Sequence, residues 1–479
     1  MPAITFIEQT PIFSPLPVGQ EIIFVVSNNQ LVSQKTKLKF VVKVFISSTT
    51  PPDVSVNDDL IGVFKTTPNN AGVGMFNVRN VVENYVNADN MAAEGSAYKG
   101  LPTGDIYRNP IHLIDKFSLS QNSIRYMKLQ FYVEYLNSTT NVIEAGSGTE
   151  TESIDYLIFN GYLKYTDDLV QVNVAHSSFG FNITQFFLNA ALGRFLTNAP
   201  STQYANLEDY GTVGMLMNTS NPQEADKIVL TYYDNSDSQI GTEDVEKTEA
   251  NGAYGVTAGL GWTSAATKQL LFLGCFPGNL QNWSTTFQAL VTAGTIQDGY
   301  YTIEMQNDAD TPMSELYTIS LNCPNARGYE SIRLAWLNQW GAWDYYTFTK
   351  KSVKTLSTKG TTYTQLGGTW NEAMYRSDSY KGGKKSFRVN TTEKIKMNTG
   401  FVREDDAVMF EELINCPEVY LLKGYGDSGA APYVSTLNQW VTPVRVTSKS
   451  LERKTIANDR LMQYTFEVEK TKMFRTQAV

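Results

Sequence analysis

The sequence of 479 residues has little histidine, little cysteine and no long hydrophobic run. The sequence has only two histidines, His112 and His176, which argues against a histidine-based metal site and against a Ser-His-Asp triad. The three cysteines, Cys275, Cys323 and Cys416, lie far apart and contain no CxxC pair, so neither a zinc ligand set nor a disulfide framework is visible. We therefore expect no catalytic residue, no metal and no cofactor, and a protein that is not an enzyme.

Membranes and nucleic acid are also disfavoured as partners. No apolar stretch approaches the roughly 18 residues of a membrane-spanning helix, and the first residues lack the basic and apolar regions of a signal peptide. Charged residues make up 18% of the chain, and the net charge of -9 argues against bulk binding to nucleic acid. We expect no membrane insertion, and folding in a reducing cytoplasm.

Neutral polar residues take the place of the missing charge, with 36 Asn and 27 Tyr. Apolar and polar residues alternate with period two in segments from one end of the chain to the other, which is typical of strands with one buried face. The clearest segments are Leu38–Ile46, Met127–Tyr135, Tyr301–Met305 and Met462–Val468. The pattern predicts a mainly β fold of several β-sandwich-like units with a few short helices.

Few segments have helical spacing. Apolar residues at i, i+3, i+4 and i+7 follow Asn77, a good N-cap, and predict a short helix over 78–86. A second is expected over 404–414, where three acidic residues suit the positive end of the helix dipole. The segment 181–196 is a further candidate. Two stretches, 241–261 and 360–385, read as loops long enough to be binding elements.

We predict three structural units with soft boundaries. Residues 1–165 would form an N-terminal β domain with one short helix, and 166–325 a middle β-sandwich-like domain. Residues 326–479 would form a C-terminal β domain with one helix and a basic segment. No repeat of fixed period is apparent, which argues against a β-helical spike.

An aromatic run in the last unit is the first candidate interaction site. It contains Trp336, Trp340, Trp343, Tyr345 and Tyr346. Trp and Tyr bury large areas at low entropic cost, so the run could anchor a neighbouring subunit or stack on a sugar. The alternative is that these rings fill the core of the last domain.

A basic segment is the second candidate. Residues 350–403 contain twelve basic and three acidic residues, a net charge of +9 that leaves -18 for the remainder. Lys381, Lys384 and Lys385 are expected at a solvated hairpin turn in this segment. The segment could meet the acidic surface of a neighbouring copy, bind nucleic acid, or be a solvated strand face and loop without a partner.

Three segments carry a resemblance to a known group of proteins. They are the strand end, turn and short helix of 66–86, the run IRLAWLNQWGAWDYYTF of 332–348, and 398–422, which is followed by a closing strand at 461–469. These segments resemble uncharacterised virion proteins of tailed bacteriophages, including crAss-like and marine phages. They hold no catalytic motif, so the resemblance carries over no active-site residue.

The resemblance implies a structural component of a phage virion, in a neck, ring or tail assembly. The implied partners are other copies of the chain in a symmetric ring or tail and neighbouring virion proteins. The implied location is the virion, assembled in the bacterial host cytoplasm. A receptor- or carbohydrate-binding adhesin of a tail or head fibre is the alternative.

Overall fold

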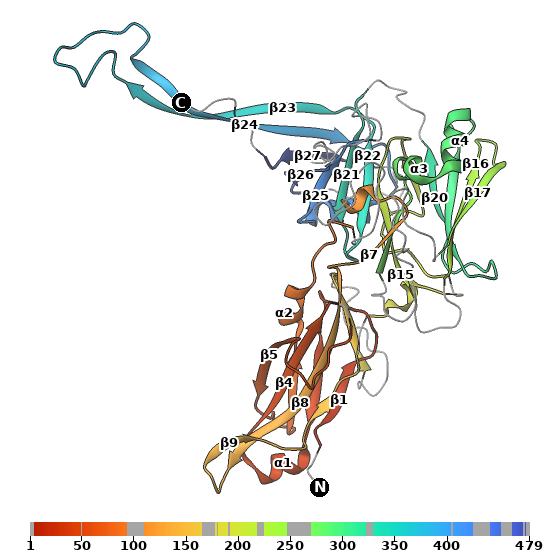
Figure 1. Cartoon of the computed structure of the whole chain (residues 1–479), viewed down its shortest axis with the longest axis vertical. Coiled ribbons are helices and arrows are strands. Elements are labelled where there is room, and N and C mark those ends of the chain that lie inside the picture. Colours follow the sequence, from red (N-terminus) through yellow and green to blue (C-terminus); the bar gives the residue numbers. More distant parts are fainter. Residues whose placement is uncertain are drawn as a thin grey trace. The chain divides into compact units, whose positions relative to one another are not determined.

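The chain is mainly β, with several sheets and a few short helices, as the alternation predicts (Figure 1). The computed structural model describes residues 4–48, 50–92, 110–164, 178–179, 181–189, 192–217, 225–246, 270–321, 329–403, 406–424, 441–451, 462–472 and 475. The described strands form five sheets. Within the described residues, no helix is long and apolar enough to cross a bilayer.

Two sheets form the N-terminal region. The first has the order β12 (Ser178–Phe179), β1 (Phe6–Pro11), β3 (Ile23–Ser27) and β6 (Val73–Asn77). The second has the order β2 (Leu16–Pro17), β11 (Tyr156–Phe159), β8 (Ile124–Asn137), β4 (Thr36–Ser47) and β5 (Leu60–Thr66), and β9 (Val142–Ala145) and β10 (Thr151–Glu152) also pair with β8.

Both N-terminal sheets contribute to one hydrophobic core, so the region is a β-sandwich. The ring centroid of Phe131 on β8 lies 5.7 Å from that of Phe24 on β3 and 6.0 Å from that of Phe76 on β6. Gly74 on β6 meets the Phe40 ring so closely that an added Cβ would lie 2.6 Å from it. The period-two pattern of β4 and β8 places these apolar side chains on the inner face.

The middle region contains two more sheets and a pair of helices. One sheet has the order β13 (Phe187–Leu188), β15 (Thr212–Met217), β18 (Leu270–Gly274) and β7 (Phe117–Leu119). The other has the order β14 (Thr202–Ala205), β20 (Tyr317–Leu321), β19 (Tyr300–Gln306), β16 (Lys227–Tyr233) and β17 (Gln239–Glu246). The helices are α3 (Pro277–Trp283) and α4 (Thr285–Ala293).

Helix α4 covers the inner face of the second middle sheet. Phe287 on α4 packs against Tyr232 and Tyr301, with ring centroids 5.7 and 5.8 Å away. Ser284 caps α4 by accepting a hydrogen bond from the Phe287 N–H. The other face of this sheet is therefore the one that the described helices leave open.

A single sheet forms the C-terminal region. Its order is β22 (Trp343–Phe348), β21 (Ile332–Leu337), β25 (Val419–Leu422), β26 (Val441–Val446), β27 (Thr465–Lys470), β24 (Gly383–Asn398) and β23 (Val353–Gln365). Helix α5 (Ala407–Asn415) packs on it through Phe410, whose ring lies 5.5 Å from Phe466 and 5.0 Å from Tyr346.

Two of the three expected helices are present. The first appears as α2 (Arg79–Val82) with the 3-10 turn η1 (Glu83–Tyr85), and the Asn77 side chain accepts from the Arg79 N–H as expected. Helix α5 confirms the second. The other short helical elements are α1 (Asn29–Gln34), η2 (Ile111–Leu113) and η4 (Ile183–Phe186).

The helix expected over 181–196 is wrong. Among the described residues of this segment, only η4 is a helical turn; it is capped by Asn182, and the chain then extends into β13. Leu192 has a φ of 61°, in the left-handed region that a right-handed helix does not use. The apolar side chains of this segment reach the core one by one instead of along a helical stripe.

The chain divides into two compact units. One comprises Met1–Asn322 with Leu337–Asp344 and Gly424–Ser435, and the other comprises Cys323–Trp336, Tyr345–Lys423 and Thr436–Val479. Both boundaries of the expected division into 1–165, 166–325 and 326–479 fall at segments outside the described residues, so that division stays a prediction.

Candidate interaction surface

The aromatic run is buried. Trp336, Trp340, Trp343 and Tyr345 are each exposed by 4% or less, and Tyr346 is only partly exposed. A side chain that anchors a partner must be accessible to it, and these four rings are not. The four rings lie in a core, but Trp340 and Trp343 belong to the compact unit that contains Met1–Asn322, and not to the last domain, where the core-packing alternative placed them.

Specific contacts hold these rings in place. The indole N–H of Trp343 donates to the Asp89 carbonyl oxygen at 3.0 Å, and the ring of Trp340 packs 4.6 Å from that of Phe186. The guanidinium of Arg333 lies 5.1 Å from the centre of the Tyr345 ring. Burial raises the pKa of Tyr346 above its ordinary value. Each of these contacts lies within one of the two units.

The basic segment forms a long two-stranded ribbon. We call residues 353–398, which comprise β23, β24 and the connection 366–382, the arm. Its strands pair from Val353 opposite Lys396 to Gln365 opposite Gly383. Figure 1 shows the two strands running together past the other strands of their sheet.

Only the base of the arm belongs to a wider sheet. Within β24, Lys394–Asn398 pairs with β27, whereas residues 383–393 pair with β23 alone. In the described part of the chain, β23 is an edge strand with no partner on its outer side. The distal arm thus exposes both of its backbone edges and both of its faces.

One face of the arm is basic. Residues opposite each other in an antiparallel pair share a face, and residues two apart in a strand do so as well. The register places five cations and no carboxylate on one face, which we call the basic face: Lys359, Lys385, Arg388, Lys394 and Lys396. The last two lie at the base, where Lys394 binds Glu467 at 3.1 Å. Lys359 and Arg388 lie on the distal part and are exposed.

The end of the arm exposes large apolar side chains. Trp370 is 84% exposed and Tyr380 73% exposed, whereas rings such as Trp336 and Phe131 are fully buried. The other large exposed apolar residues between 356 and 389 are Leu356, Leu366, Met374, Tyr375, Phe387 and Val389. An aromatic group of this kind with nearby cations has the composition of a protein-binding hot spot.

The three lysines predicted at the hairpin turn lie where the connection enters β24. Lys381 binds Asp378 at 2.8 Å, and the ammonium of Lys385 donates to the Tyr380 carbonyl oxygen at 2.6 Å, whereas Lys384 is exposed. The adjacent Gly382 and Gly383 have φ values of 97° and 75°, which favour glycine. The turn itself is the longer connection 366–382.

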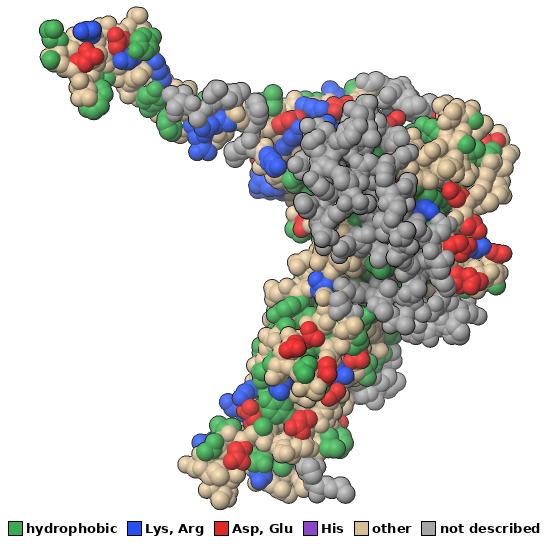
Figure 2. Space-filling model, in the orientation of Figure 1, with side chains coloured by type: hydrophobic (Ala, Val, Ile, Leu, Met, Phe, Trp, Pro, Cys, Tyr) green, Lys and Arg blue, Asp and Glu red, His purple; other side chains and the backbone are tan. Residues whose placement is uncertain are grey.

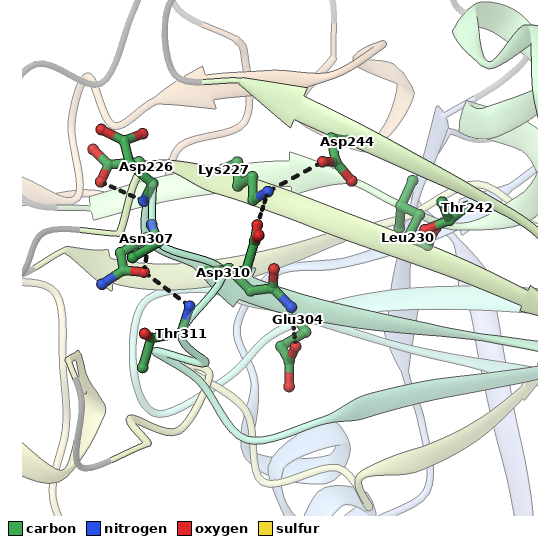
Figure 3. A network of polar contacts seen from close by, with 12 residues as sticks. Asp226, Lys227, Leu230, Thr242, Asp244, Glu304, Asn307, Asp310 and Thr311 are labelled. Carbon is green, nitrogen blue, oxygen red and sulfur yellow. Dashed lines mark hydrogen bonds and ion pairs between the residues drawn. The ribbon is translucent and has the colours of Figure 1, made fainter.

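The open face of the second middle sheet is acidic. The register places Asp244 and Glu246 of β17 and Glu304 of β19 on this face beside Lys227. Figure 3 shows Lys227 between Asp244 and Asp310, and its ammonium lies 3.3 Å from the Asp244 carboxylate. Ion pairing with Asp310 is the main cause that raises the pKa of Lys227.

We call this surface, together with the turn that follows β19, the acidic face and define it by five carboxylates: Asp244, Glu246 and Glu304 on the strands, and the exposed Asp308 and Asp310 in the turn. Figure 2 shows acidic side chains gathered in one region of the surface, and Lys and Arg side chains along the arm. The rest of the acidic face is rich in hydroxyl groups, including Thr231, Thr242 and the stacked pair Tyr233 and Tyr300.

This cluster of carboxylates gives no metal site. Among the described residues, no group of three or more His, Cys, Asp or Glu side chains is arranged to hold a metal ion. Asp226 and Asn307 accept backbone N–H groups of the β19–β20 turn instead, from Asp308 at 3.2 Å and from Thr311 at 2.9 Å. Their arrangement stabilises the turn.

Comparison with known proteins assigns this chain to no family. No family model matches the chain, and no curated protein matches it in sequence. Solved structures align weakly. Alpha-2-macroglobulin of E. coli in its native conformation has a TM-score of 0.18 and 8% identity, over 82% of this chain and 22% of that one. Dimeric latent PorU from Porphyromonas gingivalis has a TM-score of 0.17 and 7% identity, over 83% of this chain and 32% of that one.

A Salmonella alpha-2-macroglobulin variant aligns with the same TM-score, 0.18, and 8% identity, over 82% of this chain and 22% of that one. The chain spans less than a third of the length of each of these three structures. At such TM-scores the likeness carries no argument about family or activity.

Sequence reasoning found the basic segment but missed the aromatic group at its end. The sequence does not single out Trp370, Tyr375 and Tyr380, because aromatic residues there are no denser than elsewhere. The expected loop 360–385 is in fact partly strand, since β23 reaches Gln365 and β24 begins at Gly383. In the other expected loop, residues 241–246 belong to β17, and the remainder lies outside the described residues.

Proposed function

We propose that this chain is a non-enzymatic structural component of a bacteriophage virion, a neck, ring or tail assembly protein that acts through protein–protein contacts. The observation that carries the proposal is the arm. A ribbon that exposes both faces, both edges and a group of aromatic side chains has a use only if another surface covers it.

Two further features support this proposal. The resemblance of 66–86, 332–348 and 398–422 to virion proteins of tailed phages gives the setting. The acidic face and the basic arm give opposite charges on separate sheets, as expected for a protein that meets copies of itself or neighbours in a symmetric assembly.

A receptor- or carbohydrate-binding adhesin is the second candidate function. Its specific support is again at the end of the arm, where the exposed rings of Trp370, Tyr375 and Tyr380 are of the type that stacks on sugars. An adhesin would bind host cells as a purified protein, whereas an assembly component would not.

The test is quantitative mass spectrometry of purified phage particles that encode this chain. The proposal predicts that the chain is present at a fixed multiple of the portal or tail subunits and remains with the particles through purification. Its absence from intact particles would contradict a virion role. Binding of the purified chain to host cells, with inhibition of phage adsorption, would support the adhesin instead.

A further inference from the structure

The arm needs a partner surface for stability as well as for function. An isolated two-stranded ribbon is at best marginally stable in water, because its ladder of hydrogen bonds buries little apolar area. The arm has this composition: β23 contains five Thr, two Lys and only Val353, Leu356 and Tyr363 as large apolar residues. Covering one of its faces would supply the missing burial.

The charge on the arm selects the kind of surface that can cover it. Lys359 and Arg388 lie on its distal basic face among Ser357, Thr361 and Thr392, with no carboxylate on that face. Such a face favours a flat surface that is acidic and rich in hydroxyl groups. A strongly apolar surface would leave the two cations buried without partners.

The acidic face of this same chain has the required properties. It is the side of a five-stranded sheet that the described helices leave uncovered, with five carboxylates on its strands and the adjoining turn, and a set of Thr and Tyr hydroxyl groups. At about 3.3 Å per residue, the eleven residues 355–365 extend for roughly 35 Å, and the seven residues of β16 for roughly 23 Å. The arm is long enough to cross this sheet.

We propose that the basic face of the arm lies across the acidic face of a second copy of this chain. The ribbon then packs on the sheet as a second layer, with Lys359 and Arg388 close to Glu304 and Asp308. The aromatic group that includes Trp370 adds buried apolar area at the end of the contact. The inference deepens the proposed virion role by naming the partner, yet its test needs only the purified chain.

Because the arm and the acidic face are different surfaces, the contact is head-to-tail. Each copy offers one arm and one acidic face, so successive copies join into a ring if the rotation closes. The contact should weaken with salt, since exposed charges are screened beyond about 8 to 10 Å at physiological ionic strength.

Charge reversal tests the contact in both directions. The arm variant is Lys359→Glu with Arg388→Glu, and the face variant is Glu304→Lys with Asp308→Lys, which leaves the ion pairs of Lys227 unchanged. Control variants with the same charge changes elsewhere are Lys37→Glu with Lys39→Glu, and Asp58→Lys with Glu150→Lys. Circular dichroism and thermal unfolding check that each variant folds.

Sedimentation velocity at low ionic strength measures the association. We expect the wild type to sediment faster with rising concentration, and the arm and face variants each to associate at least tenfold more weakly. The two variants mixed together should associate, because the reversed arm of one meets the reversed face of the other. The controls should behave like the wild type.

Trp370→Ala keeps every charge and tests the same contact without the risk of misfolding by like charges. It should also weaken association at least tenfold. Association of the wild type that neither reversal weakens would overturn the proposal. So would a wild type that stays monomeric at all concentrations, as an arm folded onto its own chain would produce. Neither result would decide the virion role, which the mass spectrometry of purified particles tests separately.

Discussion

Two pairs of long antiparallel strands, β4–β8 and β23–β24, have the same backbone pairing and opposite surroundings. The inner face of β4–β8 carries Phe40, Val42 and Phe131, all fully buried in the N-terminal sandwich. Most of β23 is exposed to solvent. The difference shows that strand pairing alone does not make a domain, because the stability of a sheet comes from the face it buries. A pair that buries neither face needs a partner.

The largest expected effect contrasts two phenylalanines, one in each strand pair. Phe131→Ala removes a ring from the centre of the sandwich core and should lower the free energy of unfolding by about 3 to 5 kcal/mol. Phe387→Ala in the arm, where the ring is 56% exposed, should change it by less than about 0.5 kcal/mol. Chemical denaturation of both variants measures the two effects, and equal losses would contradict the contrast.

A second contrast uses two glycines. An alanine Cβ at Gly74 would lie 2.6 to 2.8 Å from three atoms of the buried Phe40 side chain, so Gly74→Ala should lower the free energy of unfolding by about 1 to 3 kcal/mol. At Gly360 in the arm, the nearest atom would be 3.4 Å away. Gly360→Ala should therefore be neutral or stabilise the chain by up to about 1 kcal/mol. Thermal unfolding measures whether each substitution raises or lowers stability. A stabilising Gly74→Ala would mean that the sandwich is packed more loosely than described.

The smallest expected effect on stability concerns an ion pair at the base of the arm. The ammonium of Lys394, followed by the Thr447 hydroxyl, lowers the pKa of Glu467 below its ordinary value. A lowered pKa means that the ion pair stabilises the fold above the ordinary pKa, and that this contribution is lost as the pH falls through the lowered one.

Glu467→Gln should accordingly lower stability at pH 7 by at most about 0.5 kcal/mol, since the side chain is 37% exposed and screened by solvent. The difference from the wild type should vanish in strongly acidic solution. Denaturation curves at several pH values measure it, with the exposed Glu150→Gln as control. A difference that persists at low pH would assign the effect to packing and not to charge.

The sequence predicted the β class well because period-two alternation is a local signal. Leu38–Ile46 and Met127–Tyr135 lie within β4 and β8, whose inner faces are buried as expected. The helix expected over 404–414, found at Ala407–Asn415, was predictable from its apolar stripe and the acidic residues that precede it. Local patterns fail where tertiary packing decides, as in 181–196, whose apolar residues also fit an irregular path through the core.

The candidate site was only half predictable. The cluster of positive charge in 350–403 is visible in the sequence, but its arrangement on one face of a ribbon depends on the register of β23 with β24. The burial of Trp336 and Trp343 could not be read from the run, because an anchor and a core ring have the same composition. The acidic face was hidden for a related reason: its carboxylates come from β17, β19 and a turn, which are far apart in sequence.

Hydrogen exchange of the backbone amides tests most directly the claim that the arm is completed by a second copy. In dilute protein at high salt, the amides of β23 and of residues 383–393 should exchange quickly, while those of β4 and β8 stay protected by the sandwich core. At high concentration and low salt, exchange in the arm should slow at least tenfold, with a matching slowing on β16 and β17. Equal exchange of the arm under both conditions would contradict the account.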